Sequence, residues 1–101
     1  MSWANHAKAR LQAGETVTVR PRGQSMRGRI ESGDVVTLKP ATVAEVNVGD
    51  AVLVRVKGND YLHLVKAKDG ERMLIGNNRG GINGWVGPNA LYGVAVKIEL
   101  P

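Results

Sequence analysis

Hydrophobic and polar positions follow a strand-like pattern along most of this chain. From residue 15 onward, short hydrophobic runs alternate with clusters of glycine, proline, asparagine and aspartate. The runs are rich in β-branched residues, which favour strands, and the clusters between them favour turns. The pattern predicts strands over 16–20, 35–38, 51–56, 61–66, 72–75 and 91–100. Residues 76–84 are rich in glycine and asparagine, and we expect a flexible loop there.

Residues 3–12 have a different pattern, because alanines alternate with basic and polar residues. This composition favours a short helix, and Gly14 is a suitable residue to end it. Several short strands spaced by turn signals are typical of all-β folds. We therefore predict a small, partly open barrel or sandwich with a short N-terminal helix. At 101 residues, the chain is expected to hold a helical segment over 1–14 and one β domain over 15–101.

The composition excludes several classes of site. There are no cysteines, so neither a disulfide framework nor a zinc–thiolate site can form. No apolar run approaches the roughly 18 residues that a membrane span requires, and the N-terminus lacks the apolar stretch of a secretory signal. We accordingly predict a cytoplasmic protein without metal or cofactor.

The charge allows an anionic partner. Lys and Arg number 14 and Asp and Glu number 9, which gives a formal net charge of +5. Nucleic acid is therefore a possible partner. Single-strand binding surfaces use several exposed aromatic side chains, however, and this chain has only Trp3, Tyr61, Trp85 and Tyr92. A basic barrel that binds nucleic acid is consequently the least favoured interpretation.

The segment Gly-Gln-Ser-Met at 23–26 lies between two predicted strands and carries the strongest chemical signal. A serine hydroxyl on such a turn is exposed, and Ser25 becomes a nucleophile if a base takes its proton. His63 and Lys66 are the candidate bases in the predicted strand 61–66. Strand alternation places them on opposite faces, so only one of them is expected to serve Ser25. The structural alternative is that His63 is a half-buried histidine bonded to a backbone carbonyl.

The order of several short motifs resembles the LexA/signal-peptidase clan of serine peptidases. In chain order they are Gly23-Gln24-Ser25-Met26, Gly33-Asp34 and Gly49-Asp50 before valine-rich strands, Asp60-Tyr61-Leu62-His63-Leu64, and Gly76-Asn77-Asn78. Together they span about residues 16–98. The resemblance implies the β fold of the LexA C-terminal domain and of signal peptidases. It also implies a serine endopeptidase that cleaves a peptide or protein substrate through an acyl-enzyme.

The resemblance also implies roles for individual residues. Ser25 is the nucleophile and His63 the base, with Lys66 as the alternative base in a looser register. A histidine accepts a proton near neutral pH without a large pKa shift, whereas a lysine needs strong desolvation. The clan further implies a substrate-side turn with backbone N–H groups for an oxyanion, and residues that support the dyad. These are Gly23, Gln24 and Met26 in the turn, and Asp34, Asn77 and Asn78 as the supporting residues.

Three positions depart from the clan's usual pattern. Gly28 stands where a proline is usual, Leu64 replaces the arginine after the base, and Asn77 replaces an aspartate. The first change is expected to loosen the substrate-side turn, and the other two remove charges that hold the base. These departures leave open an alternative function, a catalytically silent binding or regulatory module with the same β fold. The sequence does not indicate the cleavage-site preference or the oligomeric state.

Overall fold

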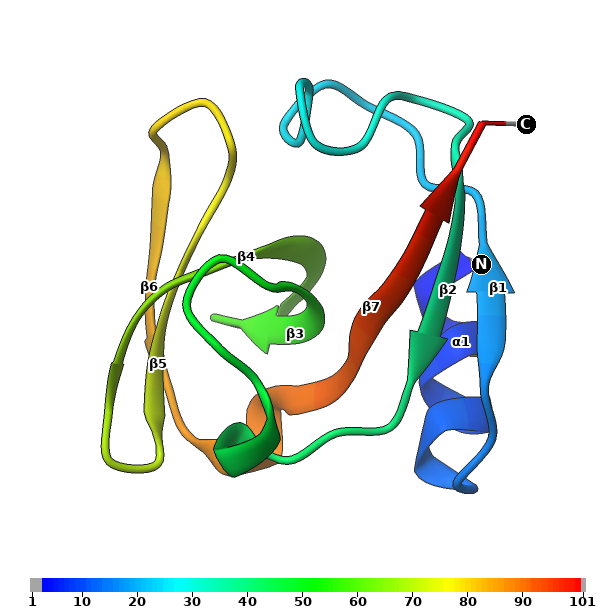
Figure 1. The fold of residues 1–101 in the computed structure, drawn as a ribbon. Helices are drawn as coiled ribbons and strands as arrows, with labels where there is room; N and C mark the ends of the chain where they lie inside the picture. The colour runs from blue at the N-terminus through cyan, green and yellow to red at the C-terminus, as the bar shows by residue number, and fades with distance from the viewer. Residues whose placement is uncertain (1–2, 101) are drawn as a thin grey trace.

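The computed structural model describes residues 3–100 and contains one helix and seven strands (Figure 1). The helix is α1 (Trp3–Gln12). The strands are β1 (Val17–Val19), β2 (Val35–Lys39), β3 (Ala51–Val56), β4 (Asn59–Asp69), β5 (Arg72–Gly76), β6 (Ile82–Val86) and β7 (Leu91–Glu99). Two 3-10 turns, η1 (Val43–Glu45) and η2 (Pro88–Ala90), precede β3 and β7.

The strands form one antiparallel sheet in the order β1-β2-β7-β3-β4-β5-β6. The last strand is therefore inserted between β2 and β3. In Figure 1 the sheet bends, so that β1 and β2 lie on one side, β5 and β6 on the other, and β3 and β4 between them. The prediction of a mostly β, partly open fold with a short N-terminal helix is confirmed.

Strand β3 contributes to two separate hydrophobic cores. Ala51 and Leu53 pack into a first core with α1, β1 and β2, whereas Val52, Val54 and Val56 pack into a second core with β5. Successive strand residues point to opposite faces, so a run of apolar residues indicates a strand that is covered on both sides. Burial of both faces of β3 explains why almost every residue in this strand is hydrophobic.

Helix α1 packs directly on the first core. Ala4, Ala7 and Leu11 are buried there at helical spacing. Lys8 Nζ also lies 2.7 Å from Asp60 Oδ2, which ties the helix to the start of β4. The division into a helical segment over 1–14 and a β domain over 15–101 remains a prediction, and residues 1, 2 and 101 lie outside the described part of the chain.

One strand lies where the sequence predicts a loop. Residues 82–86 form β6, which pairs with β5 through Met73 opposite Val86 and Ile75 opposite Gly84. The prediction of an unbroken flexible loop over 76–84 is therefore wrong for its last residues. Glycine and asparagine have low strand propensity, but propensity in sheets depends on the neighbouring strand. Here β5 supplies the pairing that the local sequence does not predict.

The Gly-Asp turns before β2 and β3 share one hydrogen-bonding pattern. Asp34 Oδ2 accepts a bond from the N–H of Glu31 at 2.9 Å, and Asp50 Oδ2 accepts one from the N–H of Asn47 at 2.8 Å. In each turn the aspartate N–H also donates to the carbonyl of that same earlier residue. These local bonds match the expected use of aspartate in turns. The first turn closes the segment that carries Ser25.

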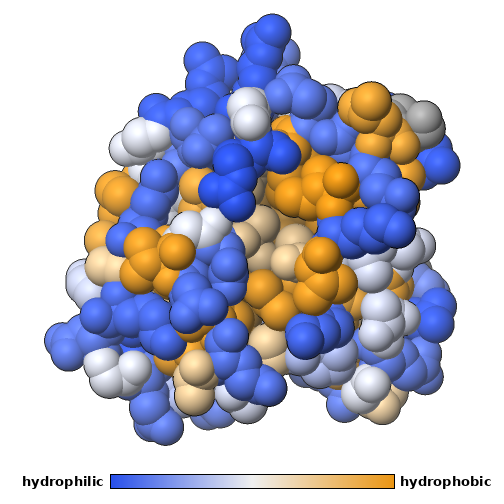
Figure 2. All heavy atoms as spheres, viewed as in Figure 1, coloured by the Kyte–Doolittle hydropathy of each residue, from blue (hydrophilic) through white to orange (hydrophobic). Residues whose placement is uncertain are grey.

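The face shown in Figure 2 is mainly hydrophilic, with separate apolar patches. Among the large hydrophobic residues in the described part of the chain, Leu100, Val48 and Ile82 are the most exposed. Their exposed fractions are 82%, 59% and 58%. Among residues 3–100, no helix has the length and apolar character needed to cross a membrane.

Candidate active site

The segment from 20 to 34 joins β1 to β2 (Figure 1). It brings Ser25 within hydrogen-bonding distance of His63 on β4. Two of its side chains, Met26 and Ile30, are buried in the first core and anchor it. The N–H of Gly33 donates to the carbonyl of Pro21 at 2.9 Å, which closes the base of the segment. Ser25 therefore lies on an anchored turn with its side chain directed toward β4.

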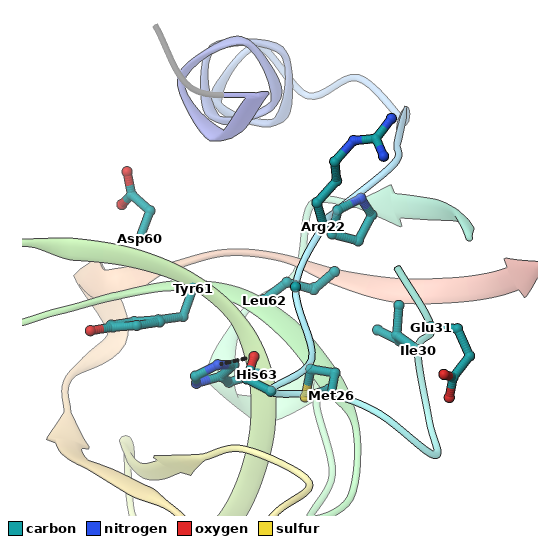
Figure 3. A pocket seen from close by; sticks show the side chains of 11 residues that line it. Arg22, Met26, Ile30, Glu31, Asp60, Tyr61, Leu62 and His63 are labelled. Carbon is teal, nitrogen blue, oxygen red and sulfur yellow. Dashed lines mark hydrogen bonds between the residues drawn. The ribbon is translucent and has the colours of Figure 1, made fainter. Parts of the chain in front are cut away.

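Ser25 and His63 are in direct contact although 38 positions separate them in the sequence. The distance from Ser25 Oγ to His63 Nε2 is 3.1 Å (Figure 3). The other ring nitrogen, Nδ1, lies 2.7 Å from Oδ1 of Asn83 on β6. A carboxamide oxygen can only accept a hydrogen bond, so Nδ1 carries the proton and Nε2 is free to accept the serine proton. The three side chains thus form a Ser–His–Asn chain in the tautomer that a general base requires.

The surroundings of His63 keep its ring fixed and neutral. The ring stacks on Tyr61 with the centroids 4.7 Å apart and an interplanar angle of 26°. Burial lowers the pKa of His63 below its usual 6.5, and the hydrogen bond to Asn83 opposes this shift. The arginines near Ser25 in sequence are not the cause. Figure 3 shows Arg22 extending away from the ring, and Arg29 donates to the carbonyl of Gly49 at 2.9 Å.

A pocket of about 190 Å³ adjoins the pair. It lies between segment 21–31 and residues 60–63 of β4, with Ser25 and His63 in its wall. The rest of the lining is mixed. Met26, Leu62 and Tyr61 contribute apolar and aromatic surface, and Arg22, Glu31 and Asp60 contribute charged groups. A serine, a neutral imidazole and a small pocket together are the components of a nucleophilic site that accepts an acyl group.

Comparison with known protein families identifies the family of this chain. The sequence model described as Peptidase S24-like matches residues 3–83, which is most of the chain. The chain belongs to the Peptidase S24-like family. The matched range contains Ser25 and His63 and ends at Asn83, so it includes all three residues of the hydrogen-bonded chain. No curated protein matches the chain.

The turn of this Peptidase S24-like chain that carries Ser25 also contains Gly23, Gln24 and Met26, for which the sequence predicts a substrate-side role. The N–H of Gly23 donates to Ser32 Oγ at 3.3 Å, and Met26 lines the pocket from the first core. Gln24 is exposed and lies outside the pocket lining. Within residues 3–100, the N–H groups of Gln24, Ser25 and Met26 take part in no hydrogen bond. They are therefore free to donate to an oxyanion on this turn.

The alternative base, Lys66, lies elsewhere on β4. It is absent from the pocket lining and lies at a register shift in the pairing of β4 with β5. Its Cε is 3.1 Å from the position that a Cβ on Gly76 would take, so the side chain lies against β5. Tyr61 and Val65 pack on the second core and Leu62 and Leu64 on the first, as strand alternation predicts. The geometry therefore favours His63 over Lys66.

Two of the three expected supporting residues hold the serine segment, and within residues 3–100 none of the three is hydrogen-bonded to His63. Asn78 donates through its backbone N–H to the carbonyl of Ser25 at 3.0 Å and through its side chain to the carbonyl of Arg27 at 2.8 Å. Asn77 accepts bonds from the N–H groups of Arg79 and Gly81, and so shapes its own loop. Asp34 is buried in the turn before β2.

Asn83 orients the base, and sequence reasoning missed it. It lies in the stretch that resembles a loop, and its neighbour Gly84 weakens any strand signal. The only local signal is its position in a hairpin that follows the base-bearing strand. That signal does not distinguish Asn83 from Asn77 or Asn78, because only the pairing of β6 with β5 brings Asn83 to His63.

Gly28 is tied into the turn instead of loosening it. Its φ is +97°, and its N–H donates to Oε2 of Glu31 at 2.7 Å. Proline has φ fixed near −65° and has no N–H, so it cannot take this conformation or make this bond. A proline at position 28 could therefore not adopt the turn that this chain forms.

Gly28→Pro is therefore expected to displace the serine segment and to slow acylation of Ser25 by a serine-reactive probe by roughly tenfold or more. The lost bond and the forced change in φ both act close to Ser25. Circular dichroism should still show a folded β protein, because the turn lies outside the sheet. Unchanged labelling of a folded Gly28→Pro variant would contradict this account of the turn.

Proposed function

We propose that this protein is a serine endopeptidase that cleaves a peptide or protein substrate through an acyl-enzyme at Ser25. The observation that supports the proposal best is the contact of 3.1 Å between Ser25 Oγ and His63 Nε2, in a ring whose tautomer is set by Asn83. Family membership supports a peptidase-like fold, and the site adds a nucleophile with a base within hydrogen-bonding distance.

In the first half-reaction, His63 Nε2 takes the proton from Ser25 Oγ as the oxygen attacks the scissile carbonyl carbon. The carbonyl oxygen becomes an oxyanion, and the free N–H groups of Gln24, Ser25 and Met26 are the donors available to it. His63 then gives its proton to the nitrogen of the leaving amine. The peptide bond breaks, and the acyl group remains on Ser25.

In the second half-reaction, a water molecule gives a proton to His63 Nε2 and attacks the acyl carbon. The bond between Ser25 Oγ and the acyl carbon breaks, and His63 returns the proton to Oγ. Throughout the cycle the Nδ1–H group stays bonded to Asn83. The neutral amide keeps the ring in place but supplies no negative charge to the imidazolium that forms.

Labelling with a fluorophosphonate probe tests the proposal. The native protein should be labelled, Ser25→Ala should not be, and His63→Ala should be labelled on the order of 10²-fold more slowly or less. Lys66→Ala should be labelled at the native rate, because Lys66 lies outside the pocket. If Lys66→Ala abolishes labelling and His63→Ala does not, the base is wrongly assigned.

The same experiment separates the other functions. A well-folded native protein that resists the probe would indicate a catalytically silent module with this β fold. Resistance together with salt-dependent binding to oligonucleotides would indicate a basic nucleic-acid-binding barrel.

The pH dependence of labelling follows from the state of His63. The base acts only when it is neutral, and burial lowers the pKa of His63 below 6.5. More than half of the His63 rings should therefore still be neutral at pH 6.5, and the labelling rate should reach half of its maximum only below that pH. Labelling rates measured over a series of pH values give the midpoint of this decrease. A midpoint above 6.5 would show that charge, and not burial, dominates around the ring.

A further inference from the structure

Asn83 is the only asparagine in the chain that is followed by glycine. It is also the residue that bonds to Nδ1 of His63, at 2.7 Å. An Asn–Gly pair is chemically unstable, because glycine has no side chain to keep its backbone nitrogen away from the asparagine carboxamide. The least stable asparagine in this sequence is thus the one that orients the proposed base.

We propose that Asn83 is a self-modification site, at which deamidation places a carboxylate on the Nδ1–H group of His63. The backbone nitrogen of Gly84 bonds to Cγ of Asn83, and the carboxamide nitrogen leaves as ammonia with the proton from that backbone nitrogen. The product is a five-membered succinimide ring. Water then opens the ring to aspartate or isoaspartate, so the net change is one water consumed and one ammonia released.

The hydrogen bond from His63 assists the first step. As the nitrogen of Gly84 adds to Cγ, negative charge develops on Oδ1, and Nδ1–H already donates to this oxygen. A donor aimed at a developing oxyanion lowers the barrier to its formation. His63 therefore activates the carboxamide that will become its own carboxylate partner.

Gly84 is open on the side where a side chain would lie. Its φ is +134°, a conformation that residues with side chains rarely adopt. The nearest heavy atom to the position of a Cβ on Gly84 is Lys57 Cε, at 3.8 Å. β6 is an edge strand, and Asn83 and Gly84 are only partly buried, so water can reach both. A carboxamide in a packed core would lack this space and this water.

The catalytic consequence rests on the proposed function. A carboxylate stabilises the imidazolium that forms during acyl transfer, and a neutral amide does not. The aspartate product is therefore expected to label with a fluorophosphonate roughly tenfold or more faster than the unmodified protein. Isoaspartate lengthens the backbone of β6 by one carbon and should not have this effect.

The acidic groups already near the imidazole ring have partners elsewhere, so the new carboxylate should have the largest effect on the pKa of His63. The titratable side chains in the pocket wall besides His63 are Arg22, Glu31, Asp60 and Tyr61. Asp60 is paired with Lys8, and Glu31 accepts from the N–H of Gly28. Tyr61 contacts the imidazole by ring stacking. A new carboxylate on Nδ1 should therefore raise the pKa of His63.

Peptide mapping by mass spectrometry tests the modification without reference to activity. The native protein is held in mildly alkaline buffer and sampled over time, and each asparagine is scored for conversion to acid. Asn83 should convert fastest, ahead of Asn77, Asn78 and Asn89. Asn83 should deamidate at the native rate in the Ser25→Ala variant and more slowly in the His63→Ala variant. In the Asn83→Gln variant, no deamidation should occur at position 83. An unconverted Asn83 beside converted asparagines elsewhere, or isoaspartate as the sole product, would overturn the proposal.

Asn83→Asp, made directly, tests the effect of the carboxylate. Nuclear magnetic resonance should show a higher pKa for His63 in this variant than in the native protein, and an equal pKa would overturn the proposed effect of the charge. The probe separates the two proposals. If neither protein reacts but Asn83 deamidates and the pKa rises, the peptidase function fails and the modification stands. If the native protein reacts with the probe but Asn83 does not deamidate, the peptidase function stands and the modification fails.

Discussion

Ser25→Ala is expected to lower kcat/KM by on the order of 10³-fold or more. Among residues 3–100, the substitution removes the only hydroxyl bonded to His63, so no acyl-enzyme can form. His63→Ala should cause a similar loss, because Ser25 then has no base. The double variant should be no slower than either single variant, since the two residues act as one unit. A peptide selected from a mixed library with the native protein provides the assay.

Ser32→Ala is the matched control for this prediction. Ser32 lies on the same segment and is exposed, and its hydroxyl accepts a bond from the N–H of Gly23 at 3.3 Å. The control should keep kcat/KM within a few-fold of the native value. If the Ser25 and His63 variants lose activity additively, the two side chains act independently and the dyad is wrong.

Gly93→Ala is expected to destabilise the protein by roughly 3 kcal/mol. Gly93 lies in β7 where α1 crosses the sheet. A Cβ at this position would be 2.6 Å from the carbonyl oxygen of Lys39 and 3.0 Å from Leu11 Cδ2. The first contact is with backbone that is held in β2, so rotation of a side chain cannot relieve it. Urea unfolding of the native and variant proteins measures the difference in the free energy of unfolding.

Gly87→Ala is the control for this experiment. No heavy atom lies within 4 Å of the position of a Cβ on Gly87, and its φ of −92° suits any residue. The control should unfold within about 0.5 kcal/mol of the native protein. Equal stability of Gly93→Ala and Gly87→Ala would show that α1 and β2 can move away from β7.

The amino-acid pattern predicts most of the secondary structure, because the information is local. The helix before Gly14, the β-branched strands and the two Gly-Asp turns all depend on neighbouring residues. The order of motifs also points to the correct family, since each motif needs only a few residues in sequence. Strand β6 is not predicted from the sequence, because the composition of its residues favours a loop and only pairing with β5 makes them a strand.

The sequence by itself determined the β class, the exposed turn that carries Ser25 and the short list of bases. Only the tertiary structure decided which base faces the serine and what orients it. His63 and Lys66 are three positions apart on one strand, but only His63 points to Ser25. Asn83 reaches His63 because the β5–β6 hairpin folds back beside β4. Contacts of this kind depend on strand pairing and on a segment anchored in the core, and neither leaves a periodic signal in the chain.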